Sequence, residues 1–320
     1  MTATASSPPL PRSVAISGAS GMVGTALRRH LEGLGVRVLR LVRRPPREPL
    51  EVEWHPDEGR IERTALETAE AVVHLAGESL AGGLWTEARK RRIRESRVQG
   101  TRLLAETLAD SAHPPHTLVS ASAVGYYGDR GDEVLTEGSE PGTGFLADVA
   151  VEWERATVPA AHAGIRVVKT RFAIILSPSG GLLGRMLLPF RLGLGAVLGS
   201  GRQWLSWITL PDVIRVIATV LATPDLAGPV NATAPEPVTN AEFTRELGKA
   251  LSRPTLLRLP APLLEAVLGD LAREGLLAST RVLPARLDSV GFDFEHPSLA
   301  PALRALLGRG GRQRAARSDN

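Results

Sequence analysis

The sequence predicts an α/β protein whose main domain is a doubly wound parallel sheet, with a smaller lobe towards its C-terminus. Three observations predict this architecture. A short apolar run at Val14–Ser17 leads through a glycine-rich turn into a helical pattern, strands alternate with helices as far as residue 176, and the pattern changes from Ser177. Strands that alternate with helices form parallel βαβ units, which build sheets of this kind.

The same pattern divides the chain into four segments. We expect a flexible leader over residues 1–11, a sheet domain over 12–176, a C-terminal substrate lobe over 177–307 and a disordered basic tail over 308–320. Glycine-punctuated apolar stretches mark the lobe, which we expect to sit over the strand ends. The prediction allows some segments of residues 177–307 to be part of the central sheet.

Apolar periodicity gives the individual elements in order. Expected strands are Val14–Ser17, Val36–Val42, Leu50–Trp54, Ala71–Leu75, Thr117–Ala121 and Ile165–Thr170, and expected helices are Met22–Leu34, Thr86–Asp110, Leu146–Ala161, Asp212–Leu221 and Asn240–Leu251. Ligands of such sheets bind beyond the carboxyl ends of the strands, so the candidate site residues are sought there.

Composition narrows the class of protein. The chain of 320 residues is 43% hydrophobic, lacks cysteine and has no apolar run near the roughly 18 residues of a membrane span. Disulfides, thiolate catalysis and cysteine-bound metals are therefore excluded. The first eleven residues do not read as a secretory signal, and we expect a soluble, cytoplasmic protein. A net charge of +4 with 4% aromatic residues does not favour a nucleic-acid partner.

The turn after the first strand is the strongest motif. Gly18, Gly21 and Gly24 follow the spacing GxxGxxG and open a helix, as in dinucleotide sites. The first glycine allows the tight turn, the second lets backbone N–H groups approach the pyrophosphate, and the third lets the helix pack closely. We therefore expect an NAD(P)-binding Rossmann domain. The expected loop contacts are Gly18, Ala19, Ser20, Gly21, Met22, Val23 and Gly24.

The end of the second strand bears on which cofactor binds. NAD sites usually place an acidic residue there to hold the ribose hydroxyls. This chain offers Arg43 and Arg44, with no acid before Glu48. A guanidinium can hold a 2′-phosphate bidentately, so the sequence favours NADP over NAD. The alternative is a pair of solvated loop arginines.

Two further strand ends are expected to face the cofactor. The strand around His74 ends in Leu75, Ala76 and Gly77, where small residues let the backbone lie against the cofactor ribose. Ser120 lies at the end of the following strand. His74 itself lies within an apolar run and is expected to be structural.

These motifs, in their order along the chain, resemble the extended short-chain dehydrogenase/reductases. The resemblance covers about residues 13–307. Within the family, the chain most resembles the subgroup described as nucleoside-diphosphate-sugar epimerases with a conserved C-terminal extension. The resemblance rests on the glycine motif, His-Leu-Ala-Gly77, Arg97-Val-Gln-Gly-Thr101 and Ser120-Ala-Ser-Ala-Val-Gly-Tyr-Tyr-Gly128, with Trp207-Ile208, Ala234-Pro-Glu-Pro237 and Gly291-Phe292 towards the end.

The resemblance implies a catalytic set that this chain only partly carries. The family uses a Tyr-x-x-x-Lys pair, a Ser or Thr and often an Asn. Ser122 fits the serine position, but Phe145 and Val149 stand where the pair is expected, and Arg97 stands at the Asn position. A phenyl ring cannot exchange a proton. We therefore keep Ser122, Tyr126, Tyr127 and Glu78 as catalytic candidates.

Other polar residues could bind the substrate. Arg97, Arg185 and Arg202 would suit a diphosphate or carboxylate, and Trp207 could form a pocket rim. The alternative for the glycine- and tryptophan-rich stretch is that it closes a sheet edge. The histidines are scattered without ligand spacing, so no metal site is expected.

Two functions remain open at this stage. The leading hypothesis is an NADP-dependent oxidoreductase or epimerase acting on a small polar molecule. The rival, motivated by Phe145 and Val149, is a catalytically weak or inactive NADP(H)-binding sensor or scaffold. The sequence leaves the substrate and the oligomeric state, monomer or homodimer, undetermined, and predicts neither a nucleic-acid nor a membrane partner.

Overall fold

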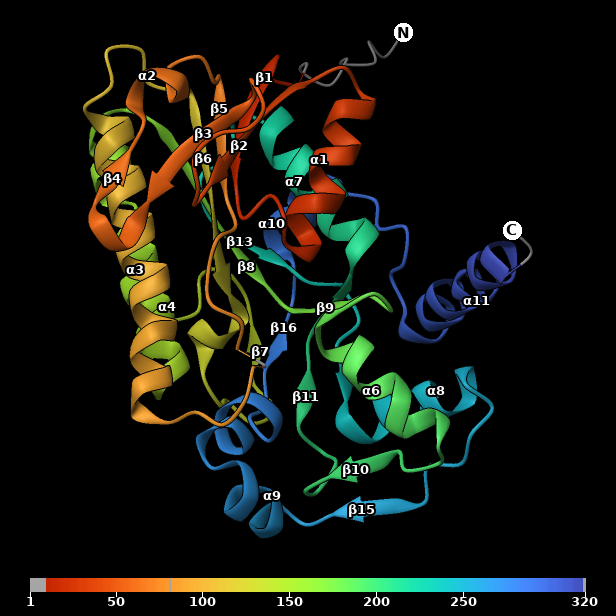
Figure 1. Cartoon of the computed structure of the whole chain (residues 1–320). Coiled ribbons are helices and arrows are strands. Elements are labelled where there is room, and N and C mark those ends of the chain that lie inside the picture. Colours follow the sequence, from red (N-terminus) through yellow and green to blue (C-terminus); the bar gives the residue numbers. More distant parts are fainter. Residues whose placement is uncertain (1–9, 81, 319–320) are drawn as a thin grey trace, which may run out of the picture.

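Figure 1 shows the computed structural model, which describes the backbone of residues 10–80 and 82–318 and the side chains as far as residue 308. Most of the expected leader, residues 1–9, lies outside the described residues.

An eight-stranded sheet forms the centre of the molecule, with the strand order β13-β8-β6-β5-β1-β2-β3-β4. Its strands are β1 (Ser13–Ser17), β2 (Arg37–Val42), β3 (Glu51–His55), β4 (Arg60–Ile61), β5 (Ala71–His74), β6 (Thr117–Ala123), β8 (Arg166–Phe172) and β13 (Gly228–Ala232). All neighbours pair in parallel except β3 and β4. The order runs outwards in both directions from β1, which confirms the predicted doubly wound fold.

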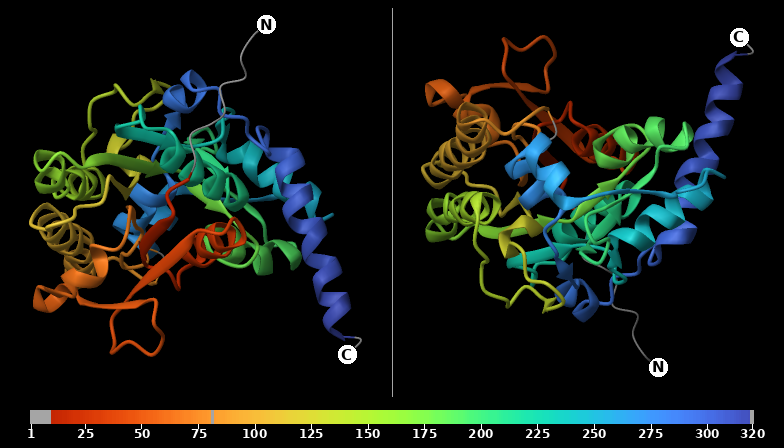
Figure 2. Two further views of the ribbon diagram at one scale, coloured as in Figure 1. Left: turned by 90° about the horizontal axis from the view of Figure 1, so that it is seen from above. Right: turned by 90° about the horizontal axis from the view of Figure 1, so that it is seen from below.

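Helices cover both faces of this sheet (Figures 1 and 2). Val14 and Ile16 pack with α1 (Met22–Gly33) and α7 (Leu210–Ala222) on one face. Ala15 packs on the other face with α3 (Glu87–Ala109) and α5 (Val158–His162). Because successive strand residues point to opposite faces, a strand covered on both sides is a continuous apolar run, as β1 is.

The second lobe has its own core. Leu183, Trp207, Phe243 and Leu303 are buried there together. Its elements are β9 (Ile174–Leu176), α6 (Gly181–Arg191), β10 (Ala196–Leu198), β11 (Trp204–Leu205), β12 (Trp207–Thr209), β14 (Val238–Thr239), α8 (Asn240–Ala250), β15 (Leu257–Leu259), α9 (Ala261–Leu268) and α11 (Leu299–Ser318). The strands form two-stranded pairs: β9 with β12, β10 with β15 and β11 with β14.

Shorter elements complete the chain. They are the helices α2 (Arg63–Leu66), α4 (Phe145–Arg155) and α10 (Ala285–Ser289), the 3₁₀ turns η1 (Pro56–Glu58) and η2 (Val124–Tyr127), the π-helical turn η3 (Leu271–Leu276), and the paired strands β7 (Val134–Leu135) and β16 (Arg281–Val282). No helix in the described part of the chain is long and apolar enough to cross a membrane.

The structure departs from the prediction at two of the following three places. The helix expected over Leu146–Ala161 is two helices, α4 and α5, because Pro159 cannot donate a backbone hydrogen bond and its ring would clash with the carbonyl of Arg155. Strand β13 and helix α7 are the segments of residues 177–307 that return to the central sheet and its cover, as the domain prediction allowed. Helix α11 continues to Ser318, so residues 308–318 are helical and not disordered.

Candidate cofactor and substrate site

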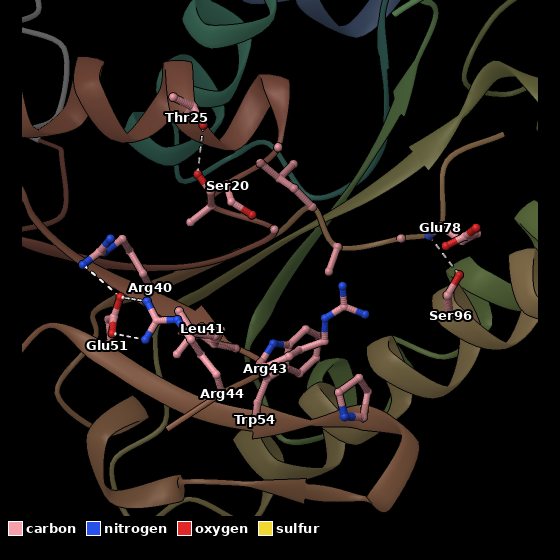
Figure 3. A pocket seen from close by; sticks show the side chains of 18 of the residues that line it. Ser20, Thr25, Arg40, Leu41, Arg43, Arg44, Glu51, Trp54, Glu78 and Ser96 are labelled. Atoms are coloured by element: carbon pink, nitrogen blue, oxygen red, sulfur yellow. Dashed lines mark hydrogen bonds and ion pairs between the residues drawn. The ribbon is translucent and has the colours of Figure 1, made fainter. Parts of the chain in front are cut away.

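A cavity of about 730 Å³ opens at the carboxyl ends of β1, β2 and β5, and we call it the cofactor pocket. Figure 3 shows its lining from close by. Residues Gly18 to Gly21 form one wall, Arg43 lies at the β2 end, and Gly77, Glu78 and Ser96 lie at the β5 end. Of the expected loop contacts, Met22, Val23 and Gly24 do not line it within the described residues.

Backbone geometry explains the three glycines. Gly18 has φ +69°, and a Cβ there would lie 2.9 Å from the backbone nitrogen of Ala76. A Cβ on Gly24 would lie 2.2 Å from the carbonyl oxygen of Gly18. No side-chain cap covers the start of α1 at Gly21, and its first turn contains no acidic residue. The uncapped start of the helix and its dipole therefore suit an anion such as a pyrophosphate.

The two arginines after β2 have different surroundings. Arg44 donates to both carboxylate oxygens of Glu51, at 2.8 and 2.7 Å. Glu51 also accepts the backbone N–H of Arg47 at 2.7 Å and lies 3.2 Å from Arg40. These contacts, with Arg44 foremost, hold the pKa of Glu51 at about 2. Figure 3 shows Arg40 and Arg44 converging on this carboxylate.

Arg43 remains available to a ligand. It is exposed, lines the cofactor pocket and has no ion-pair partner among the described residues. Arg28 of α1 lines the same pocket, although none of the sequence motifs singles it out. It lies on the turn of α1 that follows the glycine motif, and only the fold brings it beside the end of β2.

A buried hydrogen-bond unit holds the turn after β5. The Ser17 hydroxyl oxygen accepts the N–H groups of Leu75 and Ala76 at 3.1 and 3.3 Å. Its proton is therefore left to bond Nδ1 of His74 at 2.6 Å. Burial lowers the pKa of His74 to about 4, which keeps the ring neutral. Its ring packs edge-on against Trp54, whose side chain lines the pocket, so His74 has the structural role expected of it.

Glu78 lies at the β5 end of the cofactor pocket. Its backbone N–H donates to Ser96 Oγ at 3.0 Å, and its carboxylate is 3.8 Å from Arg89. The carboxylate is about two-fifths exposed, which leaves it accessible to a ligand.

Ser122 and Tyr127 belong to a buried polar network (the Glu154 network). The Ser122 hydroxyl donates to Glu154 at 2.8 Å, and Arg171 donates to both oxygens of that carboxylate at 2.7 and 2.9 Å. Arg171 also donates to the Tyr127 hydroxyl at 2.9 Å, and this hydroxyl donates to Asn231 at 2.7 Å. Burial raises the pKa of Tyr127. The network ties β6, η2, α4, β8 and β13 together.

Tyr126 differs from its neighbour. Its side chain is partly exposed, and its hydroxyl has no hydrogen-bond partner within the described residues. The Arg171 guanidinium lies 3.5 Å from its ring centroid, close enough for a cation–π contact. The structure thus leaves one of the two tyrosines with a free hydroxyl.

The positions that depart from the family's Tyr-x-x-x-Lys pattern are packed as apolar residues. Phe145 begins α4 with its ring 5.6 Å from that of Trp85, and Val149 is buried. The N–H groups of Phe145 and Leu146 donate to Glu274 of η3, at 3.1 and 2.8 Å. This end of α4 is thus capped by a distant segment of the second lobe.

Ser122, Tyr126, Tyr127 and Arg97 do not themselves line the cofactor pocket, and neither do the remaining predicted residues. Trp207 has no exposed surface and donates its ring N–H to the Glu236 carbonyl, so the expectation that it rims a substrate pocket is corrected: it is a core residue. Ser120, which was expected to face the cofactor, is buried and does not line the pocket, so that expectation is corrected. Arg185 and Arg202 are exposed and do not line the cofactor pocket. Within the described residues no three histidine or acidic side chains gather as metal ligands.

The fold and the glycine turn together define a dinucleotide-binding protein of the Rossmann type. Comparison with known proteins gives the family. The NAD dependent epimerase/dehydratase family matches residues 14–232, and a domain of unknown function (DUF1731) matches residues 259–306. The chain therefore belongs to the NAD-dependent epimerase/dehydratase family and is an NAD(P)-binding protein, as the resemblance indicates.

Individual relatives extend this match to most of the chain. Epimerase family protein Mb2239 of Mycobacterium bovis is 47% identical over 290 residues, covering 91% of this chain and 96% of that protein. The structure of human epimerase family protein SDR39U1 (isoform 2) with NADPH has a TM-score of 0.84 and 31% identity, covering 92% and 99% of the two chains. A nucleoside-diphosphate sugar epimerase from Corynebacterium glutamicum has a TM-score of 0.78 and 37% identity, covering 94% of this chain and 59% of that one.

Proposed function

We propose that the protein is an NADP(H)-dependent oxidoreductase or epimerase that acts on a small polar molecule. The observation that carries this proposal is the exposed Arg43 guanidinium in the cofactor pocket, beside an Arg44 that is already paired with Glu51. Arg43 is placed to bind a 2′-phosphate, whereas the paired carboxylate of Glu51 is not free to accept ribose hydroxyls. The related human structure contains NADPH, which supports the same assignment.

Cofactor affinity tests this proposal. The full-length protein is titrated with NADPH and with NADH, and Arg43→Gln is compared with wild type. A hydrogen-bonded charge contributes about 1.5–3 kcal/mol, so Arg43→Gln is expected to weaken NADPH binding roughly 10- to 100-fold and to leave NADH binding unchanged. Arg47→Gln is the matched control, since Arg47 lies nearby and does not line the pocket. Equal loss of both cofactors, or no loss, would contradict the assignment.

Proton transfer would use a group other than a helical tyrosine–lysine pair. A bound nicotinamide supplies hydride transfer, and the chain must then hold or accept a proton. Of our four candidates, Tyr126 has the free hydroxyl and Glu78 the accessible carboxylate. Ser122 and Tyr127 are engaged in the Glu154 network. We propose Tyr126 or Glu78 as the proton-transfer group. Glu154 and Tyr127 hold the Arg171 guanidinium against Tyr126, and Ser122 in turn donates to Glu154.

Four variants separate these roles once a turnover assay is available. Tyr126→Phe or Glu78→Gln should lower kcat by about 10²- to 10⁴-fold while NADPH affinity stays unchanged. Whichever of Tyr126→Phe and Glu78→Gln removes the proton-transfer group should lower kcat most. Tyr127→Phe and Ser122→Ala should lower kcat by less than that variant does. The reverse order would assign proton transfer to Ser122 or Tyr127.

The second candidate function is an NADP(H)-binding sensor or scaffold with little catalysis. It is favoured by the apolar packing of Phe145 and Val149 and by the burial of Ser122 and Tyr127. Tight NADPH binding, no change in nicotinamide absorbance with a panel of nucleotide sugars, ketones and enones, and co-purification with one protein would support it. Oxidation of NADPH by any member of the panel would exclude it.

The cytoplasmic location stays a prediction.

A further inference from the structure

The cations on the packed side of helix α3 differ in their partners. Arg89 donates to the Ser79 carbonyl and lies 3.8 Å from Glu78. Lys90 is paired with Asp270 of the second lobe, and Arg94 lies 3.4 Å from Glu152 of α4. Arg97 has no carboxylate within ion-pair distance among the described residues. It is the cation of this helix face that lacks a direct carboxylate contact within the described residues, and the charge of Glu78 acts on it only from a longer distance.

The position of Arg97 is fixed by its neighbours. Its guanidinium lies 5.1 Å from the ring centroid of Trp153, and the Trp153 ring N–H donates to Thr101 at 2.8 Å. One of its nitrogens donates to the Ile93 carbonyl at 3.1 Å. Because a guanidinium has five N–H donors, most of them remain unused.

Arg97 also lies directly against the end of strand β5. Its Cζ is 3.5 Å from the point where a Cβ on Gly77 would lie, and Gly77 lines the cofactor pocket. This is the β5 end of the pocket, away from Arg43 at the β2 end and on the far side of β1 from it. The free donors of Arg97 therefore lie near the carboxyl end of β5, apart from the groups suited to the adenosine phosphates.

Burial makes this arrangement costly unless an anion completes it. Burial lowers the pKa of Arg97 to about 10, and only the charge of Glu78 opposes it. A buried charge is normally paired or hydrogen-bonded, and an uncompensated one destabilises the fold. A ligand with an oxyanion would supply the missing partner, and the planar guanidinium can bind a carboxylate or a phosphate through two parallel hydrogen bonds.

We propose that Arg97 binds an oxyanion of the substrate, a carboxylate or a phosphate, at the Gly77 end of the cofactor pocket. This inference rests on the proposed function, since it places a substrate beside a bound nicotinamide cofactor. It narrows the substrate class from a small polar molecule to an anion. It also gives Arg97 a role in binding rather than in proton transfer, because a guanidinium stays protonated.

An anion titration of the full-length protein with saturating NADPH tests the proposal. Inorganic phosphate and acetate are added separately at constant ionic strength, and the ring N–H signal of Trp153 is followed by NMR, assigned with Trp153→Phe. We expect a saturable shift with at least one anion, at least a tenfold weaker affinity in Arg97→Gln, and unchanged affinity in Arg94→Gln. A shift with phosphate alone would indicate a phosphate as the ligand group, and a shift with acetate alone would indicate a carboxylate.

Further readouts keep the outcome decisive. Arg97→Lys, which keeps the charge without the planar fork, is measured in case the glutamine variant does not fold, and its anion affinity should also fall. No saturable shift in wild type, an unchanged affinity in both Arg97 variants, or displacement of NADPH by the anion would overturn the inference. NADPH binding is measured on the same samples, and the titration is repeated without it. A wild-type protein that does not bind NADPH would count against the proposed function. The anion affinity measured without NADPH would still show whether Arg97 binds an oxyanion.

Discussion

At the β1 and β2 ends of the cofactor pocket the candidate ligand-binding groups are backbone amides and an exposed arginine. Beyond the β5 end, the candidate catalytic groups are side chains held by several distant elements. Gly18 and Gly21 form a turn closed by a local hydrogen bond from the Gly21 N–H to the Gly18 carbonyl, although Gly18 also lies against Ala76 after β5. Ser122 depends on Glu154 of α4, and Tyr127 depends on Asn231 of β13. The first kind of site can be recognised in a sequence, and the second requires the fold.

The largest expected effect breaks the backbone-built end. Gly24→Ala would place a Cβ 2.2 Å from the Gly18 carbonyl oxygen, so α1 must move away from the turn. Overpacking against backbone costs several kcal/mol, and we expect about 100-fold weaker NADPH binding or more. Gly33→Ala is the control, because a Cβ on Gly33 meets nothing within 4 Å. Fluorescence titration measures both variants, and NADPH affinity within threefold of wild type for Gly24→Ala would contradict the role of the turn.

The next effect falls on the side-chain-built end. Glu154→Ala leaves the buried Arg171 without its carboxylate, and we expect the free energy of unfolding to fall by about 3–5 kcal/mol. Glu152→Ala on the same helix removes a solvent-exposed pair with Arg94 and should cost about 1 kcal/mol or less. Urea unfolding compares them. Equal losses in the two variants would show that the Glu154 network does not hold this end together.

A smaller effect concerns pH and lies between the two ends, at His74. The folded chain holds this ring neutral down to about pH 4, whereas an unfolded histidine takes up a proton near pH 6.5. The free energy of unfolding therefore has its full value, as far as His74 is concerned, above pH 6.5. It falls by up to about 3 kcal/mol as the pH drops from 6.5 to 4. In His74→Gln, which can still accept from Ser17, this part of the pH dependence should disappear. If the two unfolding curves have the same pH dependence, the ring is not held neutral.

The predictable parts of the molecule are those set by neighbours in the sequence. The run Val14–Ser17, the glycine spacing and the periodicity of α1 and α3 are local, and each was found where predicted. The short strand pairs of the second lobe were not predicted, because strands of two or three residues carry no periodicity and pair with distant partners, as β9 does with β12.

The same distinction applies to the site. Arg43 and Arg44 are equivalent in the sequence, and only the parallel register of β2 with β3 brings Glu51 to Arg44. The partner of Ser122 lies 32 residues away, and that of Tyr127 lies 104 residues away. The apolar environment of Phe145 could be expected from its own side chain, but its neighbour Trp85 could not.

A crystal structure of the protein with NADPH tests the central claim most directly. The account predicts the pyrophosphate on the N–H groups around Gly18–Gly21 and the 2′-phosphate within hydrogen-bonding distance of the Arg43 guanidinium, with Arg44 still paired to Glu51. A 2′-phosphate that points to solvent, or one held by Arg44 after it has left Glu51, would contradict the assignment.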